Sequence, residues 1–294
     1  MTQIRSAAMI VNARSRSGQD QFAEACSAMK GMPFDVDAHA VEDPDELVPT
    51  LKRALVRKPD LVILGGGDGT ISSLVDYLLG HDVVLGVLPF GTANSFCRTL
   101  GIPLDIPGAV EVLKTGRPRR IDLGMIDGDY FANCAAIGLS PQIAQTVPHG
   151  VKKLFGRAGY LAWATLQFAK FHPFQLIVGE GPNAKRMTAT EVRISNGRFH
   201  GGTELVEEAR LDSGEIIVQV VCGKGKRSLV RNWAAAFFRL ESRRVDTATF
   251  HGKALRIETV PPLPISIDGE VLAKTPVMAK VAAGIIEVMA PVEG

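Results

Sequence analysis

Short apolar runs alternate with helix-like segments through the first 120 residues, and this alternation restricts the fold more than any other feature of the sequence. The runs at residues 61–64 and 83–88 have no polar alternation, as is typical of strands buried on both faces. Segments with apolar residues at helical spacing, such as residues 45–57 and 71–79, separate the runs. Strands that alternate with helices predict a parallel, doubly wound α/β sheet.

The pattern changes near Leu123, after which short strand-like runs follow one another through turns. A chain of 294 residues is too long for one comfortable core, so we expect two domains, at residues 1–123 and 124–294. The second is expected to be rich in antiparallel sheet, with the extreme C-terminus packing back on the first. Its expected strands are residues 130–136, 174–178, 188–195, 215–221, 254–259, 264–267 and 284–289, and its expected helices are residues 154–171 and 228–239.

The charge, the cysteines and the hydropathy exclude several classes of protein. The net charge is only +2, which gives no reason to expect nucleic acid as a partner. The four cysteines lack C-x-x-C spacing, which argues against a zinc site or a disulfide framework. No run approaches the roughly 20 apolar residues of a membrane-spanning helix, and no cleavage site follows the apolar run at residues 7–11. We therefore expect a cytoplasmic protein.

Residues 60–71 run from a buried strand through a glycine-rich turn directly into a helix. The glycines allow a tight turn in which backbone N–H groups approach a ligand, and the helix N-terminus favours a phosphate. Asp68 is unusual, because a carboxylate in such a turn repels an anion unless a metal ion or many donors offset its charge. The turn therefore predicts metal-assisted phosphoryl transfer; the alternative is a plain strand-to-helix connection with Asp68 as its N-cap. The glycines are Gly65, Gly66, Gly67 and Gly69.

Two further loops follow neighbouring predicted strands. In residues 89–96, Gly91 and Thr92 are expected to contact the same phosphates. Asn94 either caps the next helix or hydrogen-bonds to the substrate. Residues 12–18 follow the first strand and carry two arginines. Three such loops at successive strand ends together predict a nucleotide site.

These residues resemble the diacylglycerol kinase-like lipid kinases, a superfamily that includes bacterial lipid kinases, sphingosine kinases and ceramide kinases. The resemblance implies a nucleotide-binding domain followed by a β-sandwich domain, with ATP, Mg²⁺ and lipid meeting in the cleft between them. A peripheral membrane surface is then an expected partner, and a homo-oligomer is left open. The motifs that carry the resemblance are residues 66–70, 89–94 and 268–270, supported by residues 133–138, 195–198 and 209–214.

The resemblance also implies roles for individual residues. Glu270 is expected to be the base that accepts the proton of the lipid hydroxyl, with Asp68 as the second catalytic residue. Asn94 and Ser95 are expected to contact the substrate. The residues expected to hold ATP are Asn12, Gly65, Gly66, Gly67, Gly69, Thr70, Gly91 and Thr92.

The sequence departs from the family at three places. Ser95 stands where many bacterial members have an Asp, and Ser213 stands where they have an Asp that helps to hold a structural magnesium ion. Asp212 and Glu215 are displaced candidates for that ion, and no metal ligand is assigned. Residues 39–41 contain no counterpart of a nucleotide-contacting Thr.

Two other functions and one structural alternative stay open. An NAD kinase shares the Gly-Gly-Asp-Gly loop, although its Gly-Ser-Thr-Ala-Tyr segment is absent here. A non-catalytic nucleotide or lipid sensor is the third candidate, motivated by Ser95 and Ser213. By pattern alone, residues 265–271 are a hairpin in which Asp268 stabilises the turn.

Residues 152–170 combine basic ends with large apolar side chains. They predict either a helix at a membrane interface, with Lys152, Lys153 and Arg157 toward anionic lipid, or a helix packed on the second sheet. The histidines lack metal-ligand spacing, and we expect them, His200 among them, at the surface or in turns.

Overall fold

The computed structural model of the chain describes residues 4–138, 171–223, 225, 247–268 and 270–292. Its first part confirms the parallel α/β sheet, with the strands in the order β4-β3-β1-β2, each parallel to its neighbour. Short 3-10 turns precede α2 and follow α3. The elements are β1 (Ser6–Asn12), α1 (Arg16–Ala28), β2 (Asp35–Val41), α2 (Leu47–Val56), β3 (Leu61–Gly66), α3 (Asp68–Val75), β4 (Val84–Pro89), α4 (Ser95–Leu100) and α5 (Ile106–Thr115).

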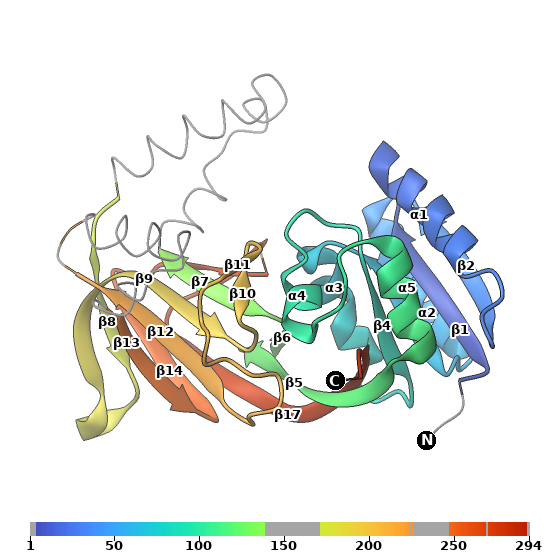
Figure 1. The fold of residues 1–294 in the computed structure, drawn as a ribbon. Helices are drawn as coiled ribbons and strands as arrows, with labels where there is room; N and C mark the ends of the chain where they lie inside the picture. The colour runs from blue at the N-terminus through green and yellow to red at the C-terminus, as the bar shows by residue number, and fades with distance from the viewer. Residues whose placement is uncertain (1–3, 139–170, 224, 226–246, 269, 293–294) are drawn as a thin grey trace.

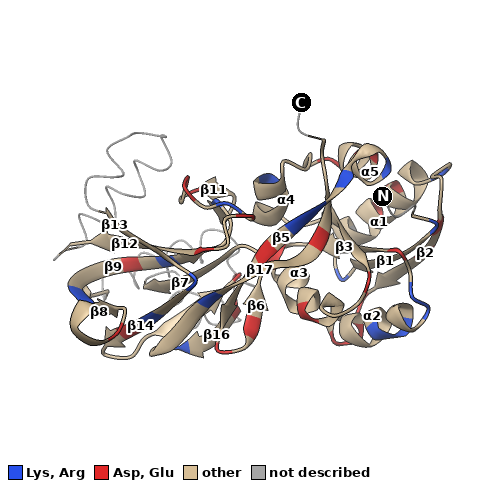
Figure 2. Cartoon of the chain, turned by 90° about the horizontal axis from the view of Figure 1, so that it is seen from below, with Lys and Arg blue, Asp and Glu red and all other residues tan. Residues whose placement is uncertain are grey.

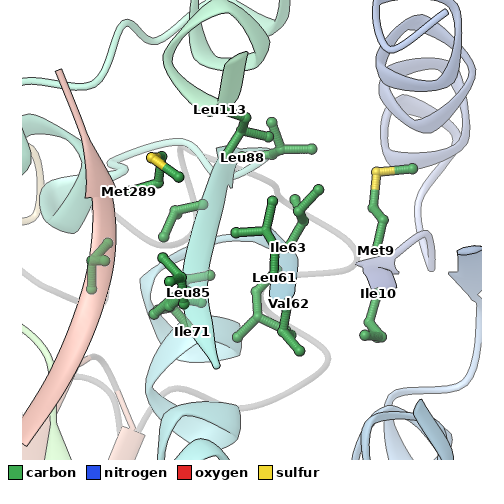
Figure 3. Close-up of a cluster of buried hydrophobic side chains, with 14 of the residues drawn as sticks. Met9, Ile10, Leu61, Val62, Ile63, Ile71, Leu85, Leu88, Leu113 and Met289 are labelled. Atoms are coloured by element: carbon green, nitrogen blue, oxygen red, sulfur yellow. The ribbon is translucent and has the colours of Figure 1, made fainter. Parts of the chain in front are cut away.

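Helices cover both faces of this sheet, because β3 and β4 are fully buried and need apolar cover on each side. Helix α1 lies against α5, and α2 lies against α3. Figure 3 shows Leu113 of α5 beside Leu88 on one side of β4, and Ile71 of α3 beside Leu85 on the other. The helices lie on the two faces of the sheet, so the loops that follow β3 and β4 lie next to each other at its carboxyl-terminal edge.

The second part is largely antiparallel, as the sequence predicts (Figure 1). Its core is a separate apolar cluster built on strands β7, β8, β9, β12, β14, β15 and β17. The strands are β5 (Arg117–Ile126), β6 (Asp129–Phe131), β7 (Cys134–Gly138), β8 (Phe174–Val178), β9 (Lys185–Ser195), β10 (Phe199–His200), β11 (Thr203–Glu204), β12 (Ile216–Cys222), β13 (Thr247–Gly252), β14 (Ala254–Val260), β15 (Pro264–Ile267), β16 (Glu270–Lys274) and β17 (Val277–Ala290).

Two long strands, β5 and β17, connect the parts. The chain's last strand, β17, pairs antiparallel with β14 and β5, and its end pairs parallel with β4. Met289 near the end of β17 is buried in the first core (Figure 3). The predicted boundary at Leu123 falls inside β5.

Five described helices and strands are not predicted from the sequence: α5, β5, β10, β11 and β13. β5 begins with the polar stretch Arg117-Pro-Arg-Arg, which has neither apolar continuity nor alternation. The predicted helix at residues 228–239 lies outside the described residues, and so does the one at 154–171 except for Phe171. Within the described part of the chain, no helix is both long and apolar enough to cross a membrane.

Candidate active site

A cavity of about 280 Å³ lies where the carboxyl ends of β3 and β4 meet the second part of the chain. Five chain segments line it: the glycine-rich turn after β3, the loop after β4, the start of β7, the turn next to β10 and the turn next to β15. The lining residues are Gly67, Asp68, Gly69, Thr92, Ala93, Ser95, Asn133, Cys134, His200, Gly201 and Asp268.

Asp68 joins the two phosphate-type loops. Its Oδ2 accepts a hydrogen bond from Ser95 N at 3.0 Å, and its Oδ1 accepts one from Phe96 N at 3.0 Å. The carboxylate therefore satisfies the first N–H groups of α4. The N-cap alternative expected Asp68 to cap its own helix and is wrong on that point, because Gly67 holds the N-cap position of α3.

The loop after β4 is held closed by Asn94. The Asn94 side chain accepts from Gly91 N at 2.9 Å and donates to Gly91 O at 2.8 Å and Pro89 O at 3.2 Å. Asn94 holds the N-cap position of α4, as one of the two alternatives predicts, but its side chain makes no capping hydrogen bond to the helix. Ser95 is buried and its Oγ accepts from Gly202 N at 3.1 Å. Asn94 and Ser95 thus fix the loop, and their predicted contact with substrate stays a prediction.

Close backbone approach explains several glycines. A Cβ on Gly91 would lie 2.5 Å from Gly67 Cα, so the two loops touch backbone to backbone. A Cβ on Gly66 would meet the Thr70 side chain at 2.5 Å. Thr70 Oγ1 in turn accepts from Asn12 Nδ2 at 3.3 Å, which ties the first loop to the glycine-rich turn. The predicted nucleotide-binding residues of all three loops are therefore brought together.

The turn at Asp268 is held by contacts from distant parts of the chain. Ser72 Oγ of α3 donates to Asp268 Oδ2 at 2.7 Å, and the backbone N–H groups of Ala132 and Cys134 donate to the same carboxylate at 3.1 and 2.9 Å. Burial raises the pKa of Asp268 to about 6, with a smaller contribution from the charge of Asp68. The expectation that Asp268 stabilises its turn agrees with these contacts.

This anchoring brings Glu270 to the glycine-rich turn. Glu270 Oε1 lies 3.7 Å from the position that a Cβ on Gly69 would occupy. The Glu270 side chain is exposed, so its carboxylate is available to a bound molecule. Its role as a base is not tested by this geometry and stays a prediction.

His200 is the residue that the sequence reading missed. It lines the cavity, and burial lowers its pKa, so the imidazole is neutral near pH 7. The predicted turn position agrees with its place at the end of β10, directly before Gly201-Gly202. A position on the open surface does not, because the side chain is half-buried and borders the cavity. The only local signal is the pair Gly201-Gly202, whose positive φ angles bring this hairpin close to Ala93.

The metal candidates Asp212 and Glu215 lie elsewhere and have other partners. Asp212 pairs with Arg119 at 2.6 Å and Arg210 at 3.4 Å, while Glu215 lies 3.8 Å from His251. Among the residues that the structure describes, no three His, Cys, Asp or Glu side chains form a metal-binding group. The basic cluster at residues 152–157 lies outside the described residues.

Two family models match the chain. The diacylglycerol kinase catalytic domain matches residues 6–126, and the YegS C-terminal NAD kinase beta sandwich-like domain matches residues 133–290. Together they include every segment that lines the cavity.

Individual proteins agree with these matches. The chain is 30% identical to a probable YegS-like lipid kinase of Pseudomonas syringae, over 75% of this chain and 72% of that protein. It is 27% identical to a diacylglycerol kinase of Staphylococcus aureus, over 88% and 85% of the two chains. A crystal structure of a putative diacylglycerol kinase from Bacillus anthracis has the same fold, with a TM-score of 0.80, 22% identity and 99% of both chains covered.

Proposed function

The chain belongs to the family of diacylglycerol kinase-like lipid kinases, and from this membership we propose that it transfers the γ-phosphate of ATP to a hydroxyl group of a lipid such as diacylglycerol or a sphingoid-type lipid. The observation that carries the proposal is the convergence of the glycine-rich turn, the loop after β4 and the Asp268–Glu270 turn on one cavity. Phosphoryl transfer needs phosphate positioning, charge neutralisation and a carboxylate for the attacking hydroxyl. The glycine-rich turn would position the phosphates, a magnesium ion would neutralise their charge, and the turn at Asp268 and Glu270 would supply the carboxylate.

The phosphates of ATP are proposed to lie over the turn at residues 65–70. The start of α3 lines the cavity there through Gly67, Asp68 and Gly69, and the positive end of the helix dipole favours an anion. Thr92 of the neighbouring loop borders the same space. Asn12 fixes the turn through its hydrogen bond to Thr70.

The cavity also fits a magnesium ion that arrives with the nucleotide. Asp68 and Asp268 both line it, and the charge of Asp68 contributes to the raised pKa of Asp268, so a cation between them would relieve repulsion. Mg²⁺ is usually held by one or two carboxylates together with substrate phosphates. Asp68 would contact it, and the ion would neutralise charge on the transferring phosphoryl group.

Glu270 is proposed to accept the proton of the lipid hydroxyl as that oxygen attacks the γ-phosphorus. Its carboxylate reaches the beginning of α3, where the γ-phosphate would end.

Because the acceptor is a lipid, we propose that the protein works at a membrane surface as a peripheral protein. Flotation of the protein with liposomes tests whether it binds a membrane surface. Strong binding that does not depend on the content of anionic lipid would contradict an electrostatic contribution to membrane binding.

Radiolabelled ATP incubated with a panel of lipids is expected to give labelled, chloroform-extractable lipid. Diacylglycerol, a sphingoid base and ceramide are tested in parallel, and NAD is included because the second matched domain is described as NAD kinase beta sandwich-like. Label transferred to NAD would support the NAD kinase alternative. Nucleotide binding without label in either product would favour the sensor and contradict the proposal.

The ionised form of Asp268 is expected to be required for activity, so kcat/KM should fall as the pH drops below about 6. The carboxylate accepts four hydrogen bonds at this turn, and protonation would place an O–H against backbone N–H donors. Asp268→Asn should lower activity and abolish the fall of kcat/KM below about pH 6, which is the acidic limb of the pH profile. The control Asp82→Asn, at an exposed turn before β4, should keep that limb. An unchanged profile in Asp268→Asn would exclude this carboxyl as its origin.

A further inference from the structure

A second cavity, of about 440 Å³, lies at the opposite end of α4 from the candidate active site. Arginines from three distant segments border it: Arg98 from α4, Arg119 from β5 and Arg210 from the loop between β11 and β12. Figure 2 shows the basic stretch of β5 running beside α4. We call this space the arginine cavity. Its remaining lining residues are Thr99, Leu100, Gly101, Asp212 and Pro291.

The arginine cavity has an excess of positive charge. Asp212 is the one carboxylate among its lining residues, and it pairs with both Arg119 and Arg210. Although burial raises the pKa of Asp212, the hydrogen bond and charge of Arg119 outweigh this and hold the pKa below its ordinary value. The carboxylate is thus ionised at neutral pH. Its short bond, at 2.6 Å, is to Arg119 and its long one, at 3.4 Å, is to Arg210, while Arg98 bonds to the carbonyl oxygen of Ala93. Arg98 and Arg210 are therefore the two cations that a ligand would meet.

The guanidinium groups are preorganised for a phosphate. Arg98 Nε donates to Ala93 O at 2.9 Å, and Arg119 and Arg210 are oriented by their bonds to Asp212. Guanidinium groups match phosphate geometry through paired N–H donors, and holding them in place lowers the entropy lost on binding. A cavity of this size accommodates a phosphate group with part of the molecule that carries it.

Helix α4 connects this cavity to the candidate active site. Ser95 at its start lines the first cavity, and Arg98 and Thr99 one turn later line the second. Thr99 Oγ1 lies 3.0 Å from Ser95 O and 3.3 Å from Asn133 Oδ1, and Asn133 also lines the first cavity. A ligand on Arg98 would therefore restrain a helix that forms a wall of the active site.

We propose that the arginine cavity is a phosphate-binding site, separate from the nucleotide site, that takes the phosphate group of a soluble anion or of an anionic lipid headgroup. This goes beyond the proposed kinase reaction, because neither ATP nor the acceptor hydroxyl is placed there. Both sources present the same chemistry to the three arginines, and they differ in whether the phosphate is free or at a membrane.

The test uses the full-length chain and two probes: inorganic phosphate, titrated by calorimetry, and vesicles of phosphatidylglycerol compared with phosphatidylcholine. The test variant is Arg98→Gln/Arg210→Gln, which leaves Arg119 to pair with Asp212. The matched control, Arg53→Gln/Arg57→Gln, removes the same charge from exposed positions on α2 and its end. Melting temperatures verify that both variants fold.

We expect the test variant to bind at least one of the probes about tenfold more weakly or worse, and the control to bind as the wild type does. A loss confined to inorganic phosphate assigns the site to a soluble anion, and a loss confined to phosphatidylglycerol vesicles assigns it to a headgroup. Equal binding by wild type and test variant overturns the proposal, as does equal weakening in both double variants or no binding of either probe. Phosphate held at the glycine-rich turn would be retained by the test variant and so would not mimic the expected loss.

Discussion

Replacing Glu270 with glutamine is expected to lower kcat by about 10² or more, with little change in ATP affinity or melting temperature. A general base contributes about 10²–10⁴ in rate and acts only while the hydroxyl attacks. Glu270 is exposed, so its removal leaves no cavity and breaks no buried contact. Steady-state kinetics, ATP titration and a thermal melt on one preparation measure the three quantities.

The hairpin interpretation of Glu270 predicts the opposite pattern: a modest loss of stability with turnover nearly intact. Glu258→Gln, at another strand position of the second part, is the matched control and should leave kcat unchanged. A value of kcat within about threefold of wild type in Glu270→Gln would remove Glu270 from the catalytic role.

Gly91→Ala is expected to lower activity by about 10² and to weaken ATP binding, because it separates the two loops that form the nucleotide site. Its Cβ would lie 2.5 Å from Gly67 Cα and 2.7 Å from Asn94 Oδ1, which is closer than non-bonded atoms tolerate. A displacement of about 1 Å in a positioning element can cost about 10² in rate. ATP affinity by calorimetry and kcat/KM toward the lipid measure the effect.

Gly67→Ala is the comparison variant, because it adds a methyl group at the ligand side of the turn without changing the spacing between the two loops. The nearest atom to its Cβ would be Gly91 Cα at 3.4 Å, so the loops keep their spacing and the protein should fold normally. The larger loss is expected in Gly91→Ala. Wild-type ATP affinity in Gly91→Ala, with a normal melting temperature, would show that contact between these loops is not needed for nucleotide binding.

Local patterns predict most of the first sheet because each of its strands and helices shows its own periodicity. The buried run at β3, the glycine-rich turn and α3 are adjacent in the sequence, and the structure keeps them adjacent. Strand β5 begins with arginines and a proline, which interrupt its apolar pattern. Helix α5 has its proline in the first turn, where a helix tolerates it, and its buried residues keep helical spacing, so its pattern was available in the sequence.

The partners within the site could not be predicted in this way. Asp68 lies in a motif that the sequence singles out, yet its hydrogen bonds go to Ser95 and Phe96 on the next loop. Asp268 reaches Ser72, 196 positions earlier in the chain. Such contacts depend on how distant strands come together, and no spacing within one segment encodes them.

His200 illustrates the same limit for the cavity wall. Its neighbours in sequence, Phe199 and Gly201, indicate only a short hairpin, whereas its partial burial comes from packing between that hairpin and the loop after β4. Family membership adds what local patterns lack, since it predicts that the segments around Asp68 and Glu270 act together.

The most direct test of the central claim is a single-turnover measurement with enzyme in excess over radiolabelled ATP and a lipid acceptor present. The wild-type protein is expected to move the label into extractable lipid, and Glu270→Gln to bind the same ATP but transfer it about 10² times more slowly. Label that reaches lipid at the same rate in both proteins, or that appears only as free phosphate or phosphorylated NAD in the wild type, would contradict the account.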